Sequence, residues 1–204
     1  MVREATKTVA TWLGVVAGLA GLEHGYFEVL QGNIRPTAMA FPSWGPVLCD
    51  PEEAWHACEP AMSILPNFLI TGILTILISL AIIVWAGLFL QRKHGGWVLI
   101  SLSIALLLFG GGLFPPIVGI VGSVAGIRIK KKLSGQPGNV THLASTLWPW
   151  PLIILVSWLF GQFIIGHFFN DFLKSIMGYA VLIILAFLPL SVYSAYAHDF
   201  VNEQ

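Results

Sequence analysis

The chain has 204 residues, of which 56% are hydrophobic and only 10% are charged, and its formal net charge is zero. Soluble globular domains carry roughly 25% charged residues, so this composition excludes a water-soluble domain and predicts an integral membrane protein. The neutral balance also argues against nucleic acid as a partner, because no overall positive field would attract it.

The first predicted membrane segment covers residues 8–31. A charged start followed by an apolar run resembles a signal peptide, but the run is long enough to be a first span that is kept. On a helix its glycines form a stripe about 60° wide, and such a stripe lets a neighbouring helix approach closely. The glycines of the stripe are Gly14, Gly18, Gly21 and Gly25.

The longest predicted connection runs from residue 33 to residue 67, on the outer side of the membrane. It contains the only two cysteines, Cys49 and Cys58, and we expect them to form a disulfide. Closing a ring of about 10 residues would stabilise the fold by roughly 2–3 kcal/mol. Free thiols, or a metal site that adds His56, are the alternatives. The loop is acidic and rich in tryptophan, which fits either a cap on the membrane surface or a solvated loop.

Three later stretches are long and apolar enough to span the membrane, because a crossing helix needs about 20 apolar residues. They cover residues 68–90, 147–169 and 176–197. The stretch between the first two of these is too long for one span and is interrupted by "GGGLFPP". Pro115 and Pro116 should break the helix there, so we expect two short segments, 97–113 and 116–129, joined by a hinge.

The distribution of basic residues favours this hairpin. With it, eight of the ten Lys and Arg residues lie on the cytoplasmic side; with a single span, they divide five to five. The eight are Arg3, Lys7, Arg92, Lys93, Arg128, Lys130, Lys131 and Lys132. We therefore predict an all-α, polytopic helical bundle with about six membrane segments, a single domain over residues 1–204. It would lie in the cell membrane with both termini in the cytoplasm.

Ionisable side chains gather near the outer end of the first segment. Glu23, His24 and Glu28 lie there; on the fifth segment, His167 reaches a similar height to Glu28 and the polar Gln162 lies a little deeper. His24 and Glu28 are one helical turn apart and flank the glycine stripe, so we expect them to face a helix–helix seam rather than lipid. Because an ionised group in hydrocarbon costs at least about 2.5–3.5 kcal/mol, such residues often mark functional sites.

Several functions fit this polar group. The leading prediction is transport or ion handling, with Glu23 and His24 as titrating groups or with a divalent metal ion held by His24, Glu28 and His167. The first alternative is a membrane-embedded enzyme, or a protein that binds a quinone or lipid, using the His/Glu pair for acid–base chemistry.

Two further alternatives are structural. One is a non-catalytic subunit of a membrane complex, and the other is a hydrogen-bonded network that only locks the helices together. The expected partners are the lipid bilayer and either further copies of the chain or other membrane subunits. The sequence does not decide whether the protein is an enzyme.

Overall fold

The computed structural model describes residues 3–42, 59–131 and 135–203. It is mostly helical, at 77%. The helices are α1 (Glu4–Gln31), α3 (Phe68–Val84), α4 (Gly95–Leu108), α5 (Phe114–Arg128), α6 (Asn139–Leu147), α7 (Trp150–Phe168) and α8 (Asn170–Asn202). A π-helical turn, η1 (Trp85–Phe89), continues α3, and two short strands, β1 (Ala40–Pro42) and β2 (Pro60–Met62), precede it.

Four helices in the described part of the chain are long and apolar enough to cross a membrane. They are α1, α3 together with η1, α7 and α8. The other two apolar helices, α4 and α5, have 14 and 15 residues, fewer than the roughly 20 that a crossing helix needs. The helical architecture agrees with the sequence, whereas the count of six membrane segments stays a prediction.

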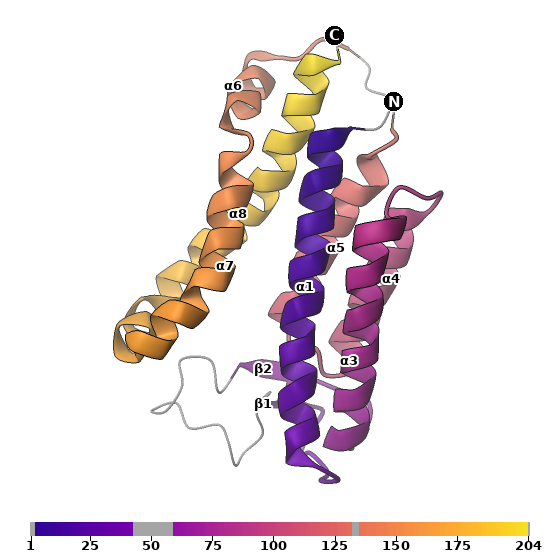
Figure 1. Ribbon diagram of the computed structural model, residues 1–204, viewed down its shortest axis with the longest axis vertical. Helices are drawn as coiled ribbons and strands as arrows, with labels where there is room; N and C mark the ends of the chain where they lie inside the picture. The colour runs from indigo at the N-terminus through magenta and orange to yellow at the C-terminus, as the bar shows by residue number, and fades with distance from the viewer. Residues whose placement is uncertain (1–2, 43–58, 132–134, 204) are drawn as a thin grey trace.

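The helices form two groups (Figure 1). α1 packs along α3 and α5, and α4 packs on α5. α7 and α8 form a hairpin that leans away from α1 towards the end of the molecule where the strands lie (Figure 1). The opposite end holds both chain termini and α6. The two groups therefore diverge on the strand side.

The seam between α1 and α3 depends on glycine. A Cβ atom on Gly18 would lie 2.5 Å from Cγ1 of Ile83, and one on Gly25 would lie 2.9 Å from the carbonyl oxygen of Gly72. Both distances are too short for a side chain, so the backbones meet only because these residues have none. The predicted close approach along the glycine stripe is confirmed.

The chain breaks between α4 and α5 over residues 109–113. Gly110 and Gly112 adopt positive φ angles of 100° and 73°, a conformation that favours glycine. Pro115 and Pro116 then occupy the first turn of α5, where a missing N–H costs little. This short connection and the packing of α4 on α5 make the two helices antiparallel.

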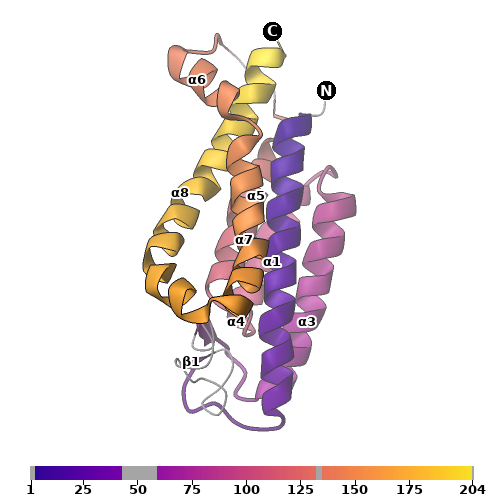
Figure 2. The same ribbon diagram turned by 60° about the vertical axis from the view of Figure 1, so that its left-hand side comes forward.

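Other boundaries differ from those expected. α8 has 33 residues and begins at Asn170 rather than at residue 176, because hydropathy detects only the apolar middle of a helix that is polar at both ends. α7 begins at Trp150 rather than at residue 147, and residues 139–147 form the separate helix α6, which the sequence analysis did not predict. Pro189 lies inside α8, which is visibly bowed in Figure 2.

Two parts of the long outer connection, β1 and β2, lie side by side. β1 pairs with β2 in antiparallel register, with Phe41 opposite Ala61. These two residues and Phe68 form a small apolar cluster beside the start of α3. Cys49, His56 and Cys58 lie outside the described residues, so the structure does not address the predicted disulfide or its alternatives.

Candidate functional site

The polar end of α1 faces the protein interior. His24 is 5% exposed and Glu28 is fully buried, so the prediction that both point away from lipid is confirmed. Both side chains lie against the loop that joins α4 and α5. A Cβ atom on Gly110 would collide with the Glu28 carboxyl group, and one on Gly112 would lie 2.5 Å from Nε2 of His24.

The two nitrogen atoms of His24 have different surroundings. Nε2 lies 3.5 Å from Oε2 of Glu59, which directly precedes β2. Nδ1 is buried and has no hydrogen-bond partner among the described residues. The sequence shows that the outer loop is acidic but does not predict that Glu59 contacts His24. The pairing of β1 with β2, and the contacts of Ser63 and Ile64 with the end of α4, hold the end of that loop beside α1.

A cavity of about 390 Å³ lies between α1, α5 and α7. Four polar side chains line it, and the rest of its wall is aliphatic or aromatic. The polar residues are Glu23, His24, Gln162 and Glu59. Val16 and Ala17 line the same cavity about two turns before His24 on α1, roughly 12 Å away along the helix axis. The cavity is thus polar at the strand end and apolar towards the middle of the bundle.

A second cavity of about 270 Å³ adjoins the first, between α5, α7 and α8. The two share four lining residues: Glu59, Phe114, Leu159 and Gln162. Glu59 and Gln162, the two polar residues among these four, therefore line both cavities. Their lining residues lie on α1 and α5 on one side and on the α7–α8 hairpin on the other.

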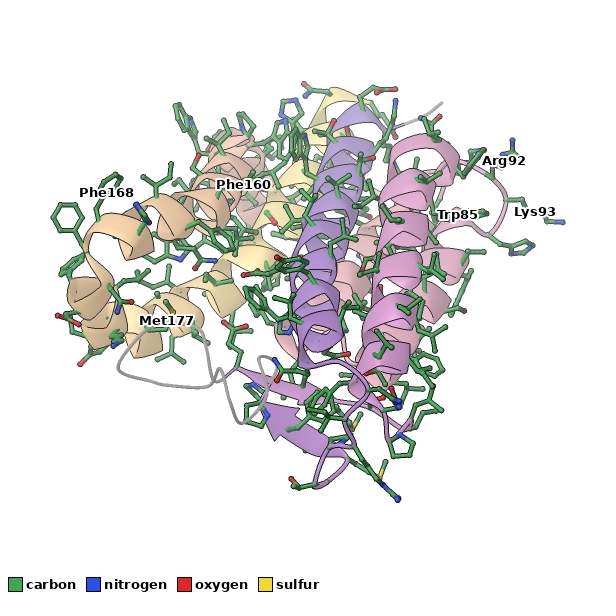
Figure 3. All side chains as sticks on the ribbon, turned by 60° about the horizontal axis from the view of Figure 1, so that its bottom comes forward. Trp85, Arg92, Lys93, Phe160, Phe168 and Met177 are labelled. Carbon is green, nitrogen blue, oxygen red and sulfur yellow. The ribbon has the colours of Figure 1, made fainter. Side chains whose placement is uncertain are left out.

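His167 does not join this group. It is exposed near the end of α7, and its ring packs on that of Phe168 at a centroid distance of 4.8 Å. Figure 3 shows Phe168 at the far end of the α7–α8 hairpin, away from α1. In the described part of the chain, no three His, Cys, Asp or Glu side chains gather as metal ligands. The structure therefore does not assemble the predicted set of His24, Glu28 and His167.

Glu28 lies apart from the cavity, between α3 and the connection that joins α4 to α5. Thr71 of α3 is the polar side chain beside its carboxyl group, and the Thr71 hydroxyl donates to the carbonyl oxygen of Phe68 at 3.2 Å. Neither Glu28 carboxyl oxygen makes a hydrogen bond of ordinary geometry with any described residue. No pattern in the sequence predicts that Thr71 lies against Glu28.

No protein-family model, curated protein or solved structure matches this chain. Its function has to be argued from the geometry of these two polar regions.

Proposed function

We propose that this integral membrane protein binds a lipid-soluble amphiphile in the cavity between α1, α5 and α7. The observation that supports the proposal is the one-sided lining of the cavity, with Glu23, His24, Glu59 and Gln162 at one end and apolar side chains elsewhere. Its volume of about 390 Å³ is typical of small-molecule sites, which are mostly apolar with a few orienting polar groups. Binding of a lipid or quinone was the first alternative to transport in the sequence analysis.

The polar end of the cavity favours some ligand head groups over others. Two carboxylates, Glu23 and Glu59, flank the imidazole of His24. Like charges repel strongly where water is scarce, so a phosphate head would bind poorly there. A head that carries a positive charge, or a neutral one that exchanges hydrogen bonds with His24 and Gln162, fits the same groups. The apolar part of the ligand would lie along Val16 and Phe160.

Binding of single-chain amphiphiles tests the proposal. Decylamine, decanol and decyl phosphate share one tail and differ only in the head. We expect the purified protein in detergent to bind the amine and the alcohol at least about tenfold more tightly than the phosphate, as measured by competition against a fluorescent fatty amine. Equal affinity for all three would contradict recognition by the polar end.

A cavity-filling variant supplies the matched control. Ala20 lines the cavity, whereas Ala81 on α3 is exposed and does not line it. Ala20→Trp should reduce amine affinity by about tenfold or more because the indole occupies the space of the tail. Ala81→Trp should leave affinity unchanged. Full binding by Ala20→Trp would show that the ligand binds elsewhere.

A further inference from the structure

Glu28 is the most deeply buried acidic residue among those described, with no solvent exposure. Neither of its carboxyl oxygens makes a hydrogen bond of ordinary geometry in that part of the chain, although the Thr71 side chain lies beside them. Burial of an ionised carboxylate without a partner costs several kcal/mol, so proteins pair such groups with donors or with cations, or keep them protonated. The groups around Glu28 distinguish these three outcomes.

The neighbouring hydroxyl groups are already committed as donors. Thr71 donates to the carbonyl oxygen of Phe68, and Thr75 donates to the carbonyl oxygen of Phe109. Each hydroxyl has one hydrogen and two lone pairs. Once the hydrogen is donated, the oxygen can still accept a hydrogen bond or coordinate a cation. Thr71 is 1% exposed and Thr75 is fully buried. The side of α3 that carries them therefore presents oxygen lone pairs to the interior.

The α4–α5 connection adds further negative character. α4 ends at Leu108, and the carboxyl end of a helix carries a partial negative charge from its aligned peptide dipoles. Gly110, two residues later, lies against the Glu28 carboxyl group. A helix interrupted inside a membrane protein is a recurring place for cation binding, because carbonyl oxygens at the end of its first half can coordinate the ion. At the end of α4, the carbonyl oxygens of Leu108 and Phe109 each accept one hydrogen bond, from the backbone N–H of Ile64 and from the Thr75 hydroxyl, and each keeps a second lone pair.

From this arrangement we infer that Glu28, Thr71 and the end of α4 form a binding site for one alkali-metal cation, with Na⁺ or Li⁺ as its natural size class. All the candidate ligands are oxygen atoms, which hard cations prefer. The site has a single carboxylate, so a monovalent ion neutralises it, whereas a divalent ion would leave excess positive charge buried. Glu28 does not line the amphiphile cavity, so this inference is independent of the proposed function.

Thermal unfolding of the purified protein in detergent tests the site. At constant ionic strength, we expect NaCl or LiCl to raise the unfolding midpoint by about 4–10 °C over N-methylglucamine chloride, saturating with one ion per chain. Equilibrium binding of radioactive Na⁺ should give the same stoichiometry. Equal midpoints in all salts, with no bound Na⁺, would show that Glu28 is instead a neutral carboxylic acid and would overturn the inference.

Variants locate the ion. Glu28→Gln keeps the size of the side chain and removes its charge, so it should abolish the Na⁺-dependent shift. Glu4→Gln is the control, since that carboxylate is on the same helix but 71% exposed, and it should keep the full response. If Glu28→Gln does not fold, Thr71→Val decides, because loss of its hydroxyl should weaken Na⁺ binding by about tenfold or more. Wild-type affinity in Thr71→Val, or a retained shift in Glu28→Gln, would refute the site.

Discussion

The Asp199 carboxylate of α8 accepts two hydrogen bonds from Thr6 of α1, one from the backbone N–H at 2.7 Å and one from the hydroxyl at 2.6 Å. It also accepts one from the backbone N–H of Ala5 at 3.1 Å. These amides belong to the first turn of α1, where no carbonyl within the helix can satisfy them. The end of the last helix therefore caps the start of the first, and the two chain termini lie together for this reason.

Replacing this cap should lower stability. Asp199 is only 9% exposed, so Asp199→Ala leaves buried donors without an acceptor, and we expect a loss of about 1–3 kcal/mol in the free energy of unfolding. Denaturant titration in micelles, followed by circular dichroism, measures it. Asp171 is the control, because it begins α8 but its side chain is 98% exposed. Asp171→Ala should cost less than about 1 kcal/mol; a loss as large as that of Asp199→Ala would contradict the capping role.

Arg3 holds the same end of the molecule together. Its guanidinium donates to the carbonyl oxygens of Arg128, at 2.9 Å, and of Lys131, and it contacts Glu203 at 3.3 Å. A lysine has no planar fork of donors and cannot reproduce this pattern. We expect Arg3→Lys to lower the free energy of unfolding by about 1.5–3 kcal/mol.

The matched control for Arg3 is Lys93→Arg, because Lys93 is exposed in the turn between η1 and α4. Thermal midpoints of the two variants and the wild type provide the comparison. If Arg3→Lys melted at the wild-type temperature, the contacts of the Arg3 guanidinium with Arg128, Lys131 and Glu203 would not contribute to stability.

The glycine seam leads to a prediction about helix packing. Gly25 faces α3, whereas Gly161 on α7 has no neighbour within 4 Å of the position that a Cβ atom would take. Gly25→Ala should force α1 and α3 apart and destabilise the fold by about 1–3 kcal/mol, as overpacking does. Gly161→Ala should be neutral or stabilising by up to about 1 kcal/mol, since alanine favours a helix over glycine. Equal effects in unfolding experiments would show that the seam is not tightly packed.

The sequence predicts this seam well because it depends on a periodic pattern. Glycines at three- and four-residue spacing occupy one face of α1, and the ionisable residues His24 and Glu28 follow beside that face. Hydropathy likewise locates the long apolar helices, although not α6, and Pro115 marks the start of α5. These features follow from local chemistry, so a single sequence is enough to find them.

The partners of the site residues could not be predicted in the same way. Glu59 is held near His24 by a segment that pairs with β1 and with the end of α4, and strands of three residues leave almost no sequence pattern. The sequence places His167 at about the same depth in the membrane as the polar residues of α1, but His167 belongs to a helix that leans away from α1. Sequence periodicity gives the face and depth of a side chain, whereas neighbouring helices are set by packing over the whole bundle.

The orientation of the α4–α5 hairpin leads to the last prediction. The backbone N–H of Ile64 donates to the carbonyl oxygen of Leu108 at 3.0 Å, and Ser63 pairs with Phe109. Thr75, about two turns into α3, also donates to the carbonyl oxygen of Phe109, so the end of α4 lies roughly 10 Å inside the start of that span. We therefore expect the α4–α5 hairpin to reach the outer half of the membrane, although α4 has only 14 residues, and both termini to lie in the cytoplasm with the basic residues.

Cysteine labelling in intact cells measures this arrangement, in a background where Cys49 and Cys58 are replaced by serine. Leu113 is 42% exposed in the connection between α4 and α5, and Leu113→Cys should react with a membrane-impermeant maleimide added outside. Lys93→Cys and Lys130→Cys should react only after the membrane is permeabilised, because both residues lie at the opposite end of the hairpin. External labelling of Lys130→Cys together with protection of Lys93→Cys would mean that the chain crosses the membrane once between these two residues, not twice. The protein would then have one membrane segment fewer, and its C-terminus would lie on the outer side.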